Sequence, residues 1–205
     1  MVKDVTSKPP IHPVRWQAPP VDPLPAFPAP RITLFPVPGG EPEDVRVDGD
    51  GRLWTGALDG SLVRLQPDGG DARVVANTGG RPLGLGFSAD GRLLVCDSPR
   101  GLLIVDPDSA RVTPLVDRVD GRVLRFCSNV SETADGTVYF TESARAFTVG
   151  DYLGAILEAR GSGALHRLDA DGTVTTVVDG LYFANGVTPT ADGSALVIAE
   201  TQARR

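Results

Sequence analysis

Short stretches of alternating apolar and polar residues cover most of the chain after residue 39. The stretches LWTGAL (53–58) and TVYFTES (137–143) both have the period of two that is typical of a β-strand with one buried face. Asp-Gly pairs separate many of these stretches, and they favour hairpin turns because glycine accepts a positive φ. The pattern predicts an all-β fold of short antiparallel strands.

These strands and turns repeat along the chain. Each unit reads as four strands joined by three turns, and the glycines of the first turns are Gly51, Gly91, Gly136 and Gly193. Their spacings of 40, 45 and 57 residues indicate β-propeller blades, each a four-stranded antiparallel sheet. The longest spacing contains an insertion at about 144–163, in which DYLGAILEAR could form one short helix. We therefore predict a partial propeller of about three and a half blades.

The repeat divides the chain into an arm and a partial ring. Eleven of the 18 prolines precede residue 39, so residues 1–38 are expected to form an extended proline-rich arm with one possible strand at 31–37. Residues 39–205 are expected to form the partial β-propeller. Its blades are predicted at about 41–78, 80–119, 123–180 and, for an incomplete fourth blade, 181–205.

Composition and charge narrow the range of functions. The net charge is -6, and no stretch interleaves Lys or Arg with aromatic residues, so nucleic acid is not an expected partner. The sequence contains neither the apolar run of a secretory signal nor a stretch long and apolar enough to span a bilayer, and we expect a cytoplasmic protein. Cys96 and Cys127 suit neither a disulfide scaffold nor a zinc site and are expected to be buried free thiols.

Four stretches, taken in order, resemble a known superfamily. They are GEPEDVRVDGDGRLWTGALDGSLVRL, GRPLGLGFSADGRLLVCDSPRGLLIVD, FCSNVSETADGTVYFTES and GLYFANGVTPTADGSALVIAET. From about Trp16 to the C-terminus the chain is similar to the SMP-30/gluconolactonase/strictosidine synthase-like superfamily of six-bladed, often calcium-dependent propellers, and most similar to its strictosidine synthase-like branch. The resemblance implies a chain truncated at its C-terminus.

The resemblance also implies a metal site at the central tunnel, which the first residues of each inner strand face. Calcium prefers hard oxygen ligands. Glu43 matches the metal carboxylate of the first blade, although the alignment could also place Glu41 or Asp44 at this position. Asn185 matches an amide ligand of the metal. The alternatives are a solvated acidic turn at Glu43 and a turn residue before glycine at Asn185.

Ser128 and Asn129 are predicted to line the substrate side of the same tunnel. Ser128 stands eight residues before Gly136, where metal-binding members of the superfamily usually carry Asn, and Asn129 occupies the second position. A serine hydroxyl is shorter than an amide and would reach a metal only through water. This departure weakens the expectation of full calcium-dependent activity.

The leading hypothesis is a calcium-dependent hydrolase, with another divalent metal as an alternative, acting on a lactone, ester or similar small molecule. The metal would act as a Lewis acid, and no catalytic residue is assigned. The alternative is a non-catalytic propeller fragment that binds or scaffolds, with self-association through its open edge. Condensation of the strictosidine synthase type ranks lowest, because it depends on a glutamate of a later blade.

Other chemistry is set aside. The sequence has no GxSxG motif, and its two histidines, His12 and His166, fall in the arm and on an outer strand, so a Ser-His-Asp triad is not expected. Glu142 and Glu200, at strand ends, are expected to be solvated or ladder-paired. The glycines of GRPLGLG are expected to allow close packing within a strand.

Overall fold

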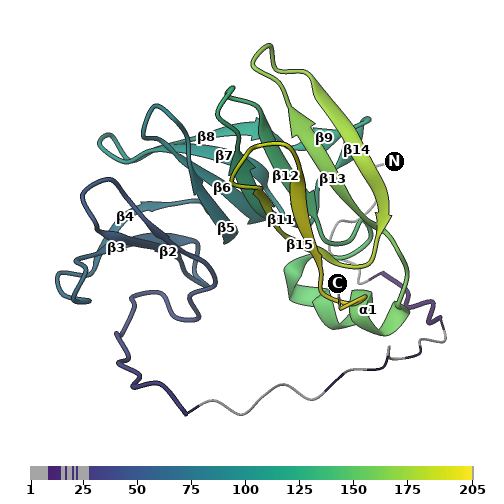
Figure 1. Cartoon of the computed structure of the whole chain (residues 1–205), viewed down its shortest axis with the longest axis horizontal. Coiled ribbons are helices and arrows are strands. Elements are labelled where there is room, and N and C mark those ends of the chain that lie inside the picture. Colours follow the sequence, from purple (N-terminus) through teal and green to yellow (C-terminus); the bar gives the residue numbers. More distant parts are fainter. Residues whose placement is uncertain (1–8, 15–16, 18–19, 21, 23–27, 205) are drawn as a thin grey trace.

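The computed structural model describes residues 9–14, 17, 20, 22 and 28–204. Within these residues, three four-stranded antiparallel sheets and one two-stranded sheet lie side by side as successive blades (Figure 1). A further two-stranded hairpin joins the second blade to the third. This arrangement confirms the prediction of an all-β partial propeller.

The strands of each blade follow one another in the sequence. Blade 1 contains β1 (Val45–Val47), β2 (Leu53–Gly56), β3 (Ser61–Leu65) and β4 (Arg73–Asn77). Blade 2 contains β5 (Arg81–Phe87), β6 (Leu93–Ser98), β7 (Gly101–Asp106) and β8 (Arg111–Val116). Blade 3 contains β11 (Cys127–Glu132), β12 (Val138–Glu142), β13 (Gly163–Leu168) and β14 (Val174–Leu181). Blade 4 contains β15 (Ala184–Pro189) and β16 (Leu196–Glu200).

Three short elements complete the fold. The hairpin between blades 2 and 3 consists of β9 (Arg118–Val119) and β10 (Arg122–Val123). The predicted insertion contains a 3-10 helix, η1 (Val149–Asp151), and the helix α1 (Tyr152–Glu158). The short helix expected in this insertion is therefore present.

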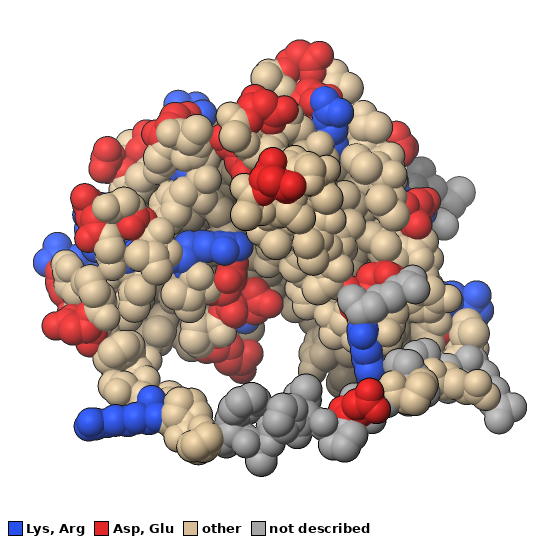
Figure 2. Space-filling model, in the orientation of Figure 1, with Lys and Arg blue, Asp and Glu red and all other residues tan. Residues whose placement is uncertain are grey.

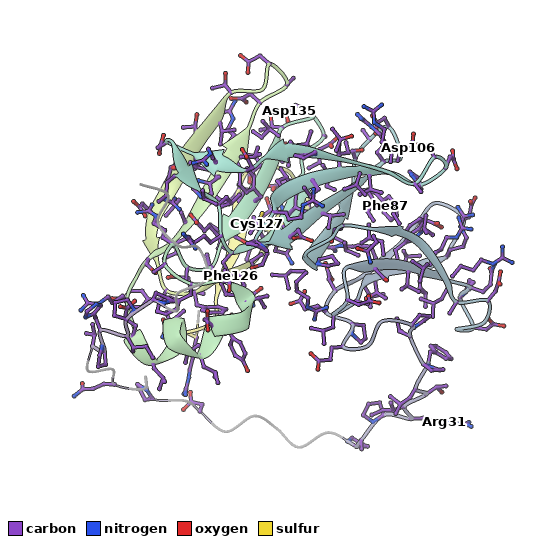
Figure 3. All side chains as sticks on the ribbon, turned by 180° about the vertical axis from the view of Figure 1, so that it is seen from behind. Arg31, Phe87, Asp106, Phe126, Cys127 and Asp135 are labelled. Carbon is purple, nitrogen blue, oxygen red and sulfur yellow. The ribbon has the colours of Figure 1, made fainter. Side chains whose placement is uncertain are left out.

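Both residues of an Asp-Gly pair stabilise the turn, the glycine by its positive φ and the aspartate by a hydrogen bond. Gly91 and Gly136 have φ values of 84° and 82°, a region in which a side chain would be strained. The preceding Asp90 and Asp135 each accept a hydrogen bond from the backbone N–H two residues later, at 3.2 and 3.1 Å. Figure 3 shows Asp135 at a hairpin tip, at the end of the blades opposite α1.

The core lies between neighbouring blades. Along β6, Leu93 and Val95 pack toward blade 1, whereas Leu94 and Cys96 pack toward blade 3. Blade 2 is consequently buried on both faces. Trp54 of blade 1 adds an edge-to-face contact with Phe87 of blade 2, with ring centroids 6.1 Å apart.

Cys96 and Cys127 belong to the same buried cluster between blades 2 and 3, and both are free thiols, as predicted. Within the described part of the chain, no helix is long and apolar enough to cross a membrane.

The possible strand at 31–37 is not formed. This segment is irregular and mostly exposed, with Ile32 73% and Leu34 87% accessible. Pro36 lacks the N–H that a ladder requires, and the segment pairs with no strand of the described chain. Two of its apolar residues contact blade 1 instead: Val37 packs against the cluster of Ala57, Val63 and Leu65, and the Phe35 ring packs over Gly69.

Candidate functional site

A cavity of about 220 Å³ lies where the inner strands of all four blades begin. Its walls come from the residues just before or within β1, β5, β11 and β15, and from the η1–α1 segment. The lining residues are Glu43, Arg81, Leu83, Phe126, Ser128, Val149, Tyr152, Phe183 and Asn185. Figure 3 shows Phe126 at the end of β11 nearest α1.

The cavity brings together three of the four predicted site residues. Glu43, Ser128 and Asn185 all line it, although they are far apart in the sequence. Asn129 does not line it. The Asn129 side-chain oxygen instead accepts the N–H of Val130 at 3.1 Å.

An irregularity recurs in three inner strands at the depth of this cavity. The pairing register shifts between Pro82 and Leu85 in β5, and β11 and β15 shift at the corresponding places. Such β-bulges re-aim side chains and are frequent beside functional sites. Here the shifted segments contain Leu83, Ser128 and Asn185, which all line the cavity.

The amide of Asn185 is held in one orientation. Its nitrogen donates to Thr201 Oγ1 at 3.1 Å, and its oxygen accepts from Ser128 Oγ at 3.3 Å. Its backbone carbonyl also accepts a 2.6 Å hydrogen bond from Thr141 Oγ1. The amide oxygen is therefore turned toward Ser128.

Thr141 and Gly84 fix the strand that carries Ser128. Thr141 is fully buried, and its hydroxyl oxygen accepts the N–H of Asn129 at 3.0 Å. A Cβ on Gly84 would lie 2.5 Å from both the Ser128 carbonyl oxygen and the Asn129 Cα, so only glycine permits this approach of β5 to β11. The expectation of close packing at a glycine of GRPLGLG is confirmed.

Glu43 presents a carboxylate at the cavity without a hydrogen-bond donor among the described residues. The residue is exposed to solvent, but the groups around its carboxyl displace enough water to raise the pKa of Glu43. The charge of Asp44 raises this pKa further, and that of Arg81 opposes the rise. Asp44 itself is engaged elsewhere, since its Oδ2 accepts the N–H of Leu85 at 2.9 Å. Glu43 is thus the more available of the two carboxylates.

Arg81 is a cavity residue that sequence reasoning missed. Its Nη2 donates to the Glu41 carbonyl oxygen at 2.8 Å, whereas its buried Nη1 has no partner in the described structure. Ser128 was selected because it lies at the start of an inner strand. Arg81 is the first residue of β5, so the same criterion would have selected Arg81.

A second missed feature is a pair of hydroxyls that join successive blades. Ser98, the last residue of β6, donates to the Arg125 carbonyl oxygen of the next blade at 2.8 Å. Ser143, directly after β12, donates to the Ala184 carbonyl oxygen at 2.6 Å. We call these two contacts the hydroxyl clasps. In the sequence, each clasp serine directly follows an acid, as Asp-Ser at Ser98 and Glu-Ser at Ser143. The same type of pair recurs in blade 4 as Glu-Thr at Thr201.

The acids of these pairs exclude one of the two alternatives expected for them, a solvated carboxylate. Glu142 and Glu200 are not solvated but buried, with 0% and 7% of their surface accessible. The Glu142 carboxylate binds the guanidinium of Arg122 through two bonds of 2.7 and 2.8 Å and lies 3.4 Å from His166 Nε2. Glu200 Oε2 accepts the N–H of Tyr182 at 2.7 Å. Both acids stabilise connections that an alternating pattern does not reveal.

The donor set of the cavity fits calcium in kind. A carboxylate, an amide oxygen and a hydroxyl are hard oxygen donors. The Glu43 carboxylate has no hydrogen-bond donor among the described residues, and a bound cation would balance its charge. Calcium takes about six to eight oxygen ligands, so these three would leave the remainder to water or substrate. Within the described chain, no three His, Cys, Asp or Glu side chains form a group that could hold a metal.

Comparisons with known proteins agree with this architecture. A family model described as Strictosidine synthase matches residues 128–205, and one described as Strictosidine synthase-like, N-terminal matches residues 31–65. Protein STRICTOSIDINE SYNTHASE-LIKE 6 of Arabidopsis thaliana is 35% identical over 170 residues, covering 80% of this chain and 46% of the relative. The adipocyte plasma membrane-associated protein of Salmo salar is 34% identical over 183 residues, covering 80% and 43%. The chain thus spans a little under half the length of these relatives.

Solved structures show the same fold at lower identity. The gluconolactonase XC5397 of Xanthomonas campestris superposes with a TM-score of 0.64 at 22% identity, over 78% of this chain and 54% of that one. The calcium-binding protein regucalcin of Agrobacterium tumefaciens gives a TM-score of 0.59 at 18% identity, over 78% and 50%. These similarities confirm the propeller fold.

Proposed function

The chain belongs to the strictosidine synthase-like branch of the SMP-30/gluconolactonase superfamily, and from that premise we propose that its cavity is the site of a calcium-dependent hydrolase for lactones, esters or similar small molecules. The observation that carries the proposal is the convergence of Glu43, Ser128 and Asn185 on one cavity. The fold shared with a gluconolactonase and with a calcium-binding protein supports it.

Each polar residue has a distinct part in the proposed site. Glu43 would hold the cation through its carboxylate, and Asn185 would offer its amide oxygen. Ser128 orients that amide through its hydrogen bond. When bound, calcium would supply Lewis-acid polarisation of a carbonyl oxygen. Arg81 adds a positive charge on the same wall.

The remaining walls indicate the kind of substrate. Leu83, Phe126 and Phe183 form one buried cluster, and Val149 and Tyr152 continue the apolar surface from the η1–α1 segment. An alkyl or aryl group would bury its surface here, whereas the hydroxyls of a sugar lactone would find few partners and would lose hydrogen bonds to water. We therefore favour an apolar ester or lactone with its carbonyl directed toward Glu43 and Asn185.

A calorimetric and kinetic comparison tests the proposal. Calcium is titrated into the wild-type chain and into Glu43→Gln, and hydrolysis of phenyl acetate, an alkyl γ-lactone and gluconolactone is followed with and without calcium. Glu41→Gln is the matched control, because this acid lies two residues away and outside the cavity lining. We expect Glu43→Gln to lower calcium affinity by roughly tenfold or more and Glu41→Gln to leave it unchanged. Absence of calcium binding by the wild type at millimolar metal would contradict the proposal.

A non-catalytic binding module is the second candidate. It is favoured by the small number of oxygen donors and by the location of His166, which is fully buried between Glu142 and Thr176 rather than at the cavity. In that case an apolar ester would bind without turnover.

Exposed apolar residues on the first and fourth blades favour self-association of such a module. Val45 and Val47 of β1 and Val197 of β16 are 55%, 60% and 56% accessible. Light scattering would detect an oligomer.

The surface charge does not favour a phosphate-backbone partner. On the face shown in Figure 2, Lys and Arg form small groups separated by acidic residues. A phosphate backbone binds a continuous basic surface. We therefore keep a small molecule as the proposed partner.

A further inference from the structure

The beginning of the described chain runs along α1, at the end of the molecule that holds the cavity (Figure 1). The Val14 N–H donates to the Glu158 carbonyl oxygen at 2.9 Å, and the His12 N–H donates to Glu158 Oε1 at 3.2 Å. Arg160 Nε returns a 3.1 Å hydrogen bond to the His12 carbonyl oxygen. His12 and Val14 are therefore fastened to the C-terminal end of α1 by one hydrogen bond between backbone groups and two that involve side chains.

Apolar residues of the arm and of the helix also line a shared hollow. Pro9 and Ile11 line a second hollow of about 260 Å³ together with Leu153 and Leu157. Tyr152 lines both this hollow and the candidate cavity. The Tyr152 side chain is thus part of the lining of both hollows.

The opposite side of α1 faces the cavity wall. Ala155 and Phe147 belong to the buried cluster that contains Phe126 and Phe183. Gly154 lies so close to the Phe147 ring that a Cβ would come within 2.5 Å of it. The η1–α1 segment, residues 149–158, is therefore a roof over the cavity, and we use that name for it below.

The roof depends on its neighbours for its position. An isolated helix of seven residues is not stable in water, and Leu153 and Leu157 remain 58% and 61% accessible even with the arm in place. Gln202 Nε2 donates to the Ile156 carbonyl oxygen. Residues 9–14 provide the contacts described above.

We propose that residues 9–14 act as a strap that holds the roof closed over the cavity, and that release of this strap admits ligands. Among the described residues, the strap belongs to none of the sheets, so it can detach while the sheets stay folded. The strap controls access to the cavity whether or not the cavity is catalytic.

A reporter thiol in the cavity tests the strap without any assay of hydrolysis. Ser128→Cys places a thiol on the cavity wall, and the native Cys96 and Cys127 are both 0% accessible, so they stay silent while the chain is folded. The rate of alkylation by iodoacetamide, followed by peptide mass spectrometry, then measures how often the cavity opens.

The strap is loosened by Ile11→Asp in the Ser128→Cys chain. Ile32→Asp is the matched control, because Ile32 also lies in the proline-rich arm but is 73% accessible and lines neither hollow. We expect alkylation at position 128 to become several-fold faster with Ile11→Asp and to stay unchanged with Ile32→Asp. Equal rates in all three chains would overturn the proposal.

Global unfolding has its own signature in this experiment. It would expose Cys96 and Cys127 to the same reagent, and both peptides would then be alkylated. If Ile11→Asp has that effect, Arg160→Ala replaces it, since this change removes only the hydrogen bond to the His12 carbonyl oxygen and a weak pairing with Glu158 at 3.8 Å. Faster alkylation confined to position 128 would support the strap, and an unchanged rate in Arg160→Ala would overturn it.

Discussion

Ser128 Oγ lies 3.3 Å from Asn185 Oδ1, so a hydroxyl of blade 3 donates to an amide of blade 4 inside the candidate cavity. Because the Asn185 nitrogen is already bound to Thr201, this contact settles which end of the amide faces Ser128. Ser128, which stands where the superfamily usually carries Asn, therefore lines the site and positions the neighbouring amide of Asn185.

Replacing Ser128 tests this positioning. Ser128→Ala removes the donor to Asn185, and we expect calcium affinity to fall by up to about tenfold, as for other residues that orient a ligand. Ser128→Asn offers an amide oxygen of its own, and we expect affinity at or above that of the wild type. Calorimetry measures both. Equal affinity in Ser128→Ala and the wild type would show that the contact has no influence on the metal.

Thr141 is predicted to stabilise the junction of blades 3 and 4. Thr141→Val keeps the shape but leaves the Asn129 N–H and the Asn185 carbonyl oxygen without their partner. We expect a loss of about 1–3 kcal/mol in the free energy of unfolding, measured with urea. Thr55→Val is the control: Thr55 is also buried, but its hydroxyl makes only one long hydrogen bond of 3.4 Å. A similar loss in both variants would contradict the assignment.

Gly84→Ala is predicted to displace the strand that carries Ser128. The new methyl group would overlap backbone atoms of Ser128 and Asn129, which cannot rotate away as a side chain could. We expect a destabilisation of about 2–3 kcal/mol in urea unfolding together with weaker calcium binding. Gly49→Ala is the control, because a Cβ there meets no atom within 4 Å. A neutral Gly84→Ala would mean that β5 and β11 can separate at little cost.

Glu142→Gln is predicted to destabilise blade 3. The change removes the charge that pairs with Arg122, whose side chain is only 35% accessible. We expect a loss of about 2–3 kcal/mol in the free energy of unfolding. The exposed Glu41→Gln should leave the urea midpoint unchanged.

The same carboxylate gives stability a defined pH dependence. Burial alone favours neutral Glu142, but hydrogen bonds from His166 and Arg122 outweigh it and hold its pKa below the usual value of 4.5. A depressed native pKa contributes stability above pH 4.5, and that contribution is lost as the pH falls through the lower native pKa. The wild type should therefore lose more stability than Glu142→Gln between pH 6 and pH 3. Parallel curves for the two chains would exclude Glu142 as a source of acid sensitivity.

The fold follows from local patterns in the sequence. Asp-Gly turns and alternating strands predict the sheets because both depend on residues close in the chain. The resemblance to a propeller superfamily adds three of the nine cavity residues, Glu43, Ser128 and Asn185, because it implies that the inner strands converge on one axis.

Asn129 shows where such reasoning ends. Ser128 and Asn129 are adjacent polar residues, and which of them faces the cavity depends on the register shift between Cys127 and Val130. That shift arises from pairing with another strand and has no local signature. The burial of Glu142 and the attachment of the arm to α1 escape prediction for the same reason, since each depends on residues distant in the chain.

The two hydroxyl clasps point in one direction along the chain. Ser98 and Ser143 each belong to an earlier blade, and their acceptors, the carbonyl groups of Arg125 and Ala184, belong to a later one. A ribosome therefore makes every donor before its acceptor. Neither clasp can form until the start of the next blade has been synthesised, so each clasp links one blade to its successor along the chain.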